Sequence, residues 1–198
     1  KGLTIKSKGK KNILFFDKDR EKIYDLDRNI YSIKSFDRRG IWVGDKRYQG
    51  MINIIFKDNN IYVINIIGIE NYLSSVVGAE MPYKWPLEAL KAQAIASRTY
   101  ALKKKGNKLF DIDSTQKDQV YKGLESRTLK TERAVRSTRS LVITYKGKLI
   151  NSLFHSGSAG QTENSEDVWS NKYDYLRSVK DFDRDNPKLI WKKSFSKN

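Results

Sequence analysis

The hydrophobic pattern of the chain changes its period at Gly68, and this change divides the sequence into two regions. Before Gly68, short β-rich runs are separated by clusters of Asp, Asn, Gly and Lys, as a meander of antiparallel hairpins requires. The runs, between residues 12 and 67, are NILFF, KIYDL, NIYSIK, GIWVG, MINIIF and NIYVINII. We therefore predict an α+β fold in which a β-rich part, residues 1–67, packs with a mixed helix and sheet part.

Two consecutive helices are predicted around Glu80. Five apolar residues beginning at Ile69 recur at the spacing of one helix face, and Gly78 is expected to end that helix. Pro86 is expected to open a second helix, about residues 87–105, which Gly106 ends. The core stripe of this second helix is predicted to be Leu87, Leu90, Ala94, Ala101 and Leu102.

Beyond the helices, the pattern predicts a third, basic helix and a return to strands. The segment from Arg127 to Arg139 is strongly basic and is expected to be partly helical, with its charges solvated. Residues 140–145 and 148–154 alternate around Lys146 and Gly147, which predicts a hairpin. A polar loop, HSGSAGQTENSEDVW at 155–169, follows this hairpin, and loops at strand ends often carry function.

Composition limits the chemistry and the partners. The 198-residue chain has no cysteine, which excludes disulfides, thiolate zinc sites and cysteine nucleophiles. Its net charge of +16 suits a polyanion, whether nucleic acid, an anionic membrane surface or an anionic cell wall. No apolar run has the length of a membrane helix. Because the chain begins at Lys1 and not at Met, we allow for a membrane anchor or export signal that has been removed.

Glu80 is the strongest candidate for a catalytic group. Met81 precedes Pro82 and is therefore pushed toward extended geometry, so that Glu80 lies at a short, stiff corner. Met81, Tyr83 and Trp85 could give the carboxyl an apolar setting that keeps it protonated, as a general acid requires. The alternative is a carboxylate at a helix end that pairs with one of the many lysines.

Four motifs together resemble one protein family. They are the block from Tyr72 to Leu102, DQVYKG at 118–123, FHSGSAGQTENSEDVW at 154–169 and YDYLRSV at 173–179. In order and spacing they resemble the SpoIID/LytB domain, the family of stage II sporulation protein D and the amidase enhancer. The resemblance implies one domain over residues 1–198, with a catalytic core at 68–191, and it implies a place outside the cytoplasm, in the cell envelope.

The resemblance also implies a reaction and a catalytic residue. Enzymatic members are peptidoglycan lytic transglycosylases, which cleave the MurNAc–GlcNAc linkage of cell-wall glycan strands and leave 1,6-anhydro-MurNAc ends. The glutamate of the family's Glu-Met-Pro motif corresponds to Glu80, and one carboxyl can suffice because the 6-hydroxyl of the sugar replaces water. A hydrolase would need a second acid, for which Glu163, Glu166 and Asp167 are candidates. The other branch of the family implies a non-enzymatic wall-binding module that stimulates a separate amidase.

Substrate contacts are expected from polar and aromatic residues of these motifs. The predicted set is Trp85, Gln93, Arg98, Gln119, Tyr121, His155, Ser156, Thr162, Glu163 and Glu166. Two alternatives stay open: Arg98 could instead anchor its helix to a carbonyl or carboxylate, and Trp85, Tyr121 and Trp169 could pack in the core instead of stacking on sugars.

Cofactors and other partners follow from the same motifs. Some relatives hold zinc with histidine and cysteine near His155; without cysteines this chain is expected to bind no metal, and no cofactor is predicted. His155 itself is either an ordinary hydrogen-bonded histidine or a glycan contact. The expected partners are peptidoglycan strands and a cell-wall amidase or another wall hydrolase; nucleic acid is not expected, because no recognition motif is present. Asp118, where relatives often have a small residue, and Ala159 with Gln161 depart from the family pattern.

Overall fold

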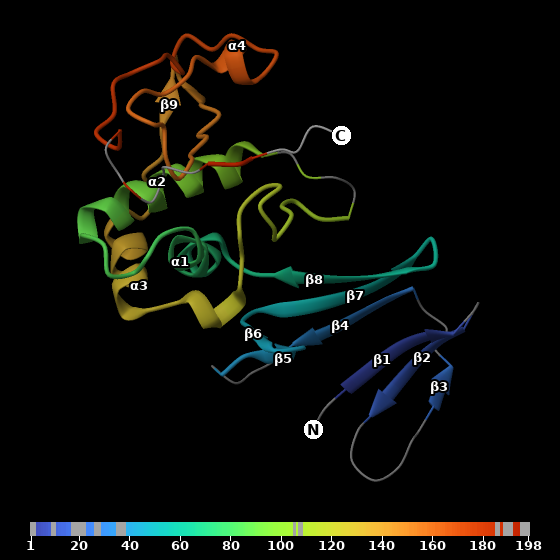
Figure 1. Cartoon of the computed structure of the whole chain (residues 1–198). Helices are drawn as coiled ribbons and strands as arrows, with labels where there is room; N and C mark the ends of the chain where they lie inside the picture. The colour runs from blue at the N-terminus through green and yellow to red at the C-terminus, as the bar shows by residue number, and fades with distance from the viewer. Residues whose placement is uncertain are drawn as a thin grey trace.

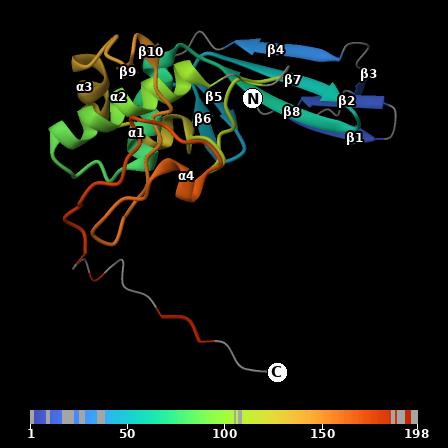
Figure 2. The same ribbon diagram turned by 90° about the horizontal axis from the view of Figure 1, so that it is seen from above.

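The computed structural model describes residues 3–8, 11–16, 23–25, 29–34, 39–104, 106, 109–184, 187 and 192–194. It confirms the α+β class. Antiparallel strands form the N-terminal part, three helices pack together beside them, and a C-terminal segment with little regular structure lies over α2 (Figures 1 and 2). Trp191, the last residue of the predicted catalytic core, lies outside the described residues.

The N-terminal strands form two three-stranded antiparallel sheets and one hairpin. One sheet joins β1 (Leu3–Lys8), β2 (Lys11–Phe16) and β3 (Ile23–Asp25); the second has the order β4 (Ile30–Lys34), β7 (Met51–Lys57) and β8 (Asn60–Ile66). The hairpin joins β5 (Ile41–Val43) to β6 (Lys46–Tyr48). All six predicted runs contain a strand, whereas β1 and β6 were not predicted, because lysines interrupt the apolar alternation in both.

Strand β7 shows why these sequences form a sheet. Its alternate residues Ile52, Ile54 and Phe56 are buried and form a small core with residues of β4, β5 and β6, while the residues between them are less buried. Asp58 and Asn59, both with positive φ, connect β7 to β8 through a two-residue turn. The alternation of buried residues in β7 and the turn residues between the strands therefore both favour this hairpin.

The helices α1 (Ile69–Glu80), α2 (Leu87–Lys103) and α3 (Leu129–Ser137) share the second core. Its buried members are Leu73, Val77, Leu90, Ala94, Ala134 and Val135. A 3₁₀ helix, η1 (Gly123–Ser126), connects the DQVYKG motif to α3, and Thr128 caps α3 by accepting from the Thr131 N–H. Leu102, predicted as core, is instead 53% exposed near the end of α2, because it lines an open cavity.

Helix α1 does not end at Gly78 as predicted but continues to Glu80. It ends where Met81 adopts an extended conformation before Pro82. The glycine at position 78 serves packing, because a Cβ there would collide with the backbone carbonyl of Ser126 in η1. The close approach of η1 to α1 therefore depends on the absence of a side chain.

We expect Gly78→Ala to destabilise the protein despite the higher helix propensity of alanine. The added methyl group would force η1 away from α1, at a cost of about 1–3 kcal/mol. Chemical denaturation measures this cost. Gly68→Ala is the matched control, since a Cβ at Gly68 meets no atom within 4 Å. Equal stability of the two variants would show that the packing of η1 on α1 does not require a glycine.

The predicted hairpin after α3 is present but short. It consists of β9 (Thr144–Tyr145) and β10 (Lys148–Leu149), joined by Lys146 and Gly147, both with positive φ. The short helix α4 (Ser165–Val168) then follows within the polar loop and was not predicted. Within the described part of the chain, no helix is both long enough and apolar enough to cross a membrane.

Candidate active site

Glu80 is the last residue of α1, and its carboxylate is held by backbone and not by a lysine. Oε1 accepts a hydrogen bond from the Val120 N–H at 2.7 Å. In the part of the chain that the structure describes, Glu80 forms no ion pair and its Oε2 has no hydrogen-bond partner. The lysine-paired alternative for Glu80 is therefore not what the structure shows. The carboxylate is partly exposed, with one oxygen fixed and the other available.

The stiff corner that follows Glu80 is tied to α3. The Trp85 N–H donates to the carbonyl of Pro82, which closes a turn, and Nζ of Lys130 donates to the carbonyl of Trp85 at 2.5 Å. Met81 packs against the helical core, whereas Tyr83 and Trp85 are 52% and 48% exposed. The aromatic rings of this corner therefore face solvent, where they are available to a ligand.

A buried polar network supports the segment that holds Glu80. The Tyr72 hydroxyl donates to Oε1 of Gln119 at 3.0 Å, and Nε2 of Gln119 donates to the Ser97 carbonyl. Gln93 donates to the Ser97 hydroxyl in turn. Gln93 and Gln119, predicted as substrate contacts, are both buried in this network. Their observed contacts connect α1, α2 and the Gln119–Val120 backbone, and so position the N–H that binds Glu80.

Two tyrosines, Tyr121 buried and Tyr72 partly buried, complete the support. The Tyr72 and Tyr121 rings pack with centroids 5.1 Å apart, and the Tyr121 hydroxyl donates to Oδ1 of Asn65. Burial raises the pKa of both hydroxyls, and the nearby negative charges of Asp118 and Glu80 raise that of Tyr72 further. Both tyrosines therefore stay protonated donors. Tyr121 is 8% exposed, which makes it a core aromatic.

Asp118 organises the start of the same segment. Its Oδ1 accepts from Nζ of Lys104 at 2.5 Å and from the Tyr100 hydroxyl at 2.8 Å, and its Oδ2 accepts from the Asp113 N–H. Burial opposes the ionised form, but these hydrogen bonds hold the pKa of Asp118 below its usual range. The departure from the family pattern at this position thus fixes the loop to the end of α2.

Arg98 lies in the interior, with 1% of its side chain exposed. Its guanidinium binds both carboxylate oxygens of Glu70, at 3.0 and 2.8 Å, and donates to the carbonyls of Ala94, Val135 and Leu141. These contacts connect α1, α2, α3 and the segment before β9. They are the contacts of a structural anchor, which was the second of the two interpretations open for this residue.

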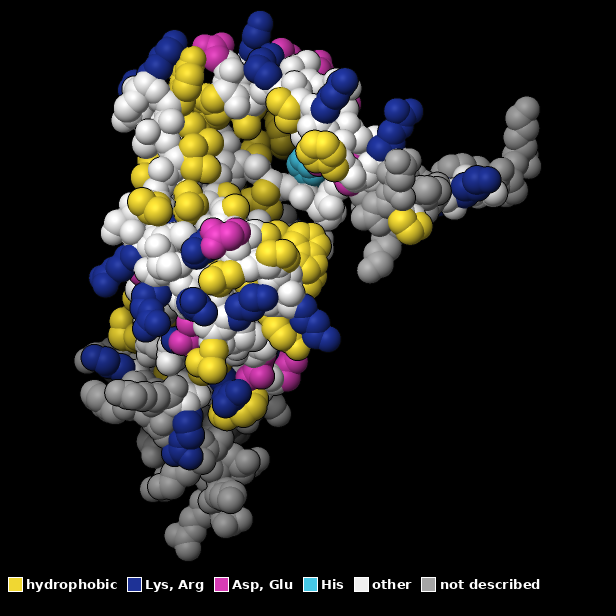
Figure 3. All heavy atoms as spheres, turned by 90° about the vertical axis from the view of Figure 1, so that its left-hand side faces the viewer, with side chains coloured by type: hydrophobic (Ala, Val, Ile, Leu, Met, Phe, Trp, Pro, Cys, Tyr) yellow, Lys and Arg dark blue, Asp and Glu magenta, His cyan; other side chains and the backbone are white. Residues whose placement is uncertain are grey.

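The polar loop after β10 holds the other predicted residues. His155, Ser156 and Glu163 are exposed, and His155 is the histidine visible at the surface in Figure 3. Thr162 is bonded through its backbone and hydroxyl to Val179. Among the described residues, no hydrogen bond joins this loop to Glu80, and no group of three or more His, Asp or Glu side chains is arranged to hold a metal ion.

Glu166 is held in an ion pair with Arg177. Its two carboxylate oxygens accept from Nη1 and Nη2 of Arg177, at 2.7 and 2.5 Å. These bonds lower the pKa of Glu166 to about 2. Glu166 is therefore ionised at neutral pH and cannot donate a proton there. The ion pair holds α4, which contains Glu166, against the YDYLRSV motif, which contains Arg177.

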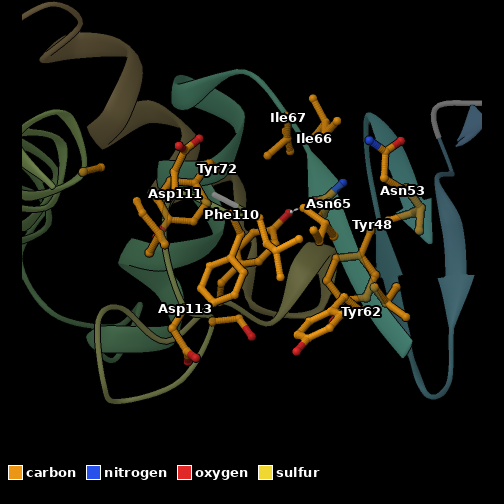
Figure 4. A pocket seen from close by; sticks show the side chains of 18 of the residues that line it. Tyr48, Asn53, Tyr62, Asn65, Ile66, Ile67, Tyr72, Phe110, Asp111 and Asp113 are labelled. Atoms are coloured by element: carbon orange, nitrogen blue, oxygen red, sulfur yellow. Dashed lines mark hydrogen bonds between the residues drawn. The ribbon is translucent and has the colours of Figure 1, made fainter. Parts of the chain in front are cut away.

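A cavity of about 850 Å³ lies away from Glu80. It is bounded by β7, β8, the start of α1 and residues 109–114, and Tyr72, Asn65 and Phe110 contribute to its walls (Figure 4). Glu80 does not line it. Tyr72 and Tyr121 belong both to this wall and to the support of the segment that holds Glu80.

Comparison with known proteins gives the family. The SpoIID model, described as "Stage II sporulation protein", matches residues 57–145. The chain is 35% identical over 164 residues to stage II sporulation protein D of Bacillus amyloliquefaciens, covering 72% of this chain and 46% of the relative. This chain belongs to the SpoIID family. Glu80 and Val120, whose N–H binds the Glu80 carboxylate, both lie within the segment that the SpoIID model matches.

Two further relatives extend the comparison. An uncharacterized protein of Brachyspira hyodysenteriae is 40% identical over 144 residues, which is 71% of this chain and 39% of that protein. The amidase enhancer of Bacillus subtilis (strain 168) is 40% identical over 125 residues, 63% of this chain and 17% of that protein. The chain thus spans less than half the length of the curated relatives it matches.

Several supporting residues of this SpoIID chain were not predicted as site residues. They are Tyr72, Val120, Lys104 and Lys130. Tyr72 was included only as the first residue of a family motif and among the five apolar residues of its helix face. A tyrosine on the inner face of a helix needs a partner for its hydroxyl, and that need was the available signal. Val120 contributes a backbone group, for which the sequence carries no signal.

Proposed function

We propose that this chain is a peptidoglycan lytic transglycosylase that acts outside the cytoplasm, with Glu80 as acid and then base. The observation that carries the proposal is the Glu80 carboxylate, which has one oxygen fixed at 2.7 Å from the Val120 N–H and the other without a partner among the described residues. A group that must pass a proton needs both features: a fixed position and one accessible oxygen.

The proposed reaction needs one carboxyl group and no water. Protonated Glu80 donates its proton to the glycosidic oxygen while the bond from that oxygen to C1 of MurNAc breaks. The resulting carboxylate accepts the proton of the C6 hydroxyl while the O6–C1 bond forms. The products are a free hydroxyl on the leaving sugar and a 1,6-anhydro end, and Glu80 is protonated again.

The other acidic residues support a mechanism with a single carboxyl. A retaining or inverting hydrolase needs a second carboxyl group at a defined distance from the first. Glu166 is bound by Arg177, and Glu163 is exposed with no described bond to the site. The basic side chains spread over the face in Figure 3 suit an anionic wall polymer as substrate.

A second candidate function is a non-enzymatic module that binds the wall and stimulates an amidase. The 40% identity to a protein named amidase enhancer favours it. The two candidates separate when purified sacculi are incubated with the protein alone and with a cell-wall amidase. The transglycosylase releases anhydro ends without the amidase, whereas the enhancer binds sacculi, leaves no anhydro ends and increases only the release of stem peptides by the amidase.

A further inference from the structure

A second cavity, of about 500 Å³, lies between the C-terminal end of α2 and the segment that follows β10. We call it the α2 cavity. Tyr100 and Lys103 of helix α2 and the following Lys104 contribute to its walls, and the C-terminal segment contributes Trp169 and Tyr173 together with asparagines. Its volume is within the range of small-ligand sites. The C-terminal segment lies over α2 in Figure 1, so that two parts of the chain distant in sequence enclose this space.

The walls carry groups that suit an acetylated sugar. Trp169 is 49% exposed and offers a broad ring face and an indole N–H donor. Asn171 and Lys103 are exposed, and in the described part of the chain neither side chain has a hydrogen-bond partner. An aromatic face, a free carboxamide and a free ammonium group together match a pyranose ring, its acetamido group and the negative charge of the strand that carries it.

The α2 cavity is connected to Glu80 through one short segment. Lys104 and Tyr100 of the cavity wall both bind Asp118. Two residues further along the chain, Val120 binds the Glu80 carboxylate. Two residues span at most about 7 Å, so the cavity and the carboxylate lie at the two ends of the same small loop.

We propose that the α2 cavity is a remote subsite for the glycan strand whose cleavage is assigned to Glu80. An N-acetylated sugar ring binds there against Trp169 and Tyr173, and Lys103 faces the anionic groups of the strand. This proposal rests on the proposed function for the identity of the strand. It adds a binding site away from the scissile bond, and it assigns a role to Asp118 in fixing one wall of that site.

The test measures binding in the absence of cleavage. In a Glu80→Gln background, Trp169→Ala is titrated by calorimetry with an uncharged N-acetylglucosamine oligomer and with soluble wall glycan strands. We expect both affinities to fall about tenfold. Trp42→Ala is the matched control, because Trp42 is 63% exposed on β5 and does not line the cavity. A second variant, Lys103→Gln, is expected to weaken binding of the anionic strands and to leave the uncharged oligomer unaffected.

The outcomes separate this subsite from the proposed reaction. Affinities that are equal in the Trp169 and Trp42 variants overturn the subsite, even if the wild-type protein releases anhydro ends. Binding that depends on Trp169, together with a wild-type protein that releases no anhydro ends, supports the sugar subsite and contradicts the transglycosylase reaction. A change in thermal stability of Trp169→Ala is measured in parallel, and binding is compared below the melting temperature of both variants.

Discussion

Glu80→Gln is expected to lower the rate of anhydro-end release by about 10²–10⁴-fold, the usual contribution of a general acid and base. Glutamine keeps the shape of the side chain, and its amide oxygen can still accept from the Val120 N–H, but it cannot donate a proton to the leaving oxygen. The fold should therefore persist while catalysis is lost. Mass spectrometry of digested sacculi measures the rate, and thermal unfolding measures the fold.

Glu88→Gln is the matched control for this experiment. Glu88 is an exposed glutamate in the first turn of α2 and pairs with Lys91 on the surface. The same chemical change eight residues away should leave the rate of release within twofold of the wild-type rate, since surface pairs of this kind contribute about 0–1 kcal/mol. Loss of release in both variants, or in neither, would contradict the role assigned to Glu80.

Arg98→Ala is expected to destabilise the protein by on the order of 3–5 kcal/mol, the cost of removing one partner from a buried ion pair. The substitution removes the guanidinium donors to Glu70 and to the Leu141 carbonyl, and one of the donors to the Val135 carbonyl. Because Glu70 is 30% exposed and can regain water, the lower end of the range is expected. In a chain of this length that corresponds to a fall in melting temperature of roughly 6–20 °C.

Two comparisons distinguish this anchor from a substrate contact. Arg136→Ala, an exposed arginine on α3, should change stability by less than about 0.5 kcal/mol. Arg98→Lys should restore little, because an ammonium group cannot bind both oxygens of Glu70 and the carbonyls together. A stable Arg98→Ala variant with poor glycan binding would instead assign Arg98 to substrate.

Periodicity predicted the helices and the main sheet because their residues are paired with neighbours close in sequence. Alternation in β7, and the helical stripe that includes Leu73 and Val77, are local signals that the buried cores confirm. The end of α1 was predicted two residues early, since Gly78 has a packing role with a segment almost fifty residues away. From the sequence alone, a glycine that ends a helix cannot be distinguished from a glycine that allows another segment to pack closely.

The candidate site was predictable in its chemistry and not in its geometry. Glu80 could be selected from its corner and its motif, but the N–H that fixes it comes from Val120, forty residues later. The buried positions of Gln93, Arg98 and Gln119 depend on how three helices meet, which no local pattern specifies. Polar residues of a motif can therefore be buried and hold the segments around a candidate site in place.

We propose that Glu80 catalyses an intramolecular cleavage of glycan strands. Digestion of purified sacculi in ¹⁸O-labelled water, followed by mass spectrometry of the released fragments, tests it most directly. The proposed mechanism predicts 1,6-anhydro-MurNAc ends that carry no label, in amounts that depend on Glu80. Labelled reducing ends would show hydrolysis instead, and intact strands would show that the chain does not cleave glycan.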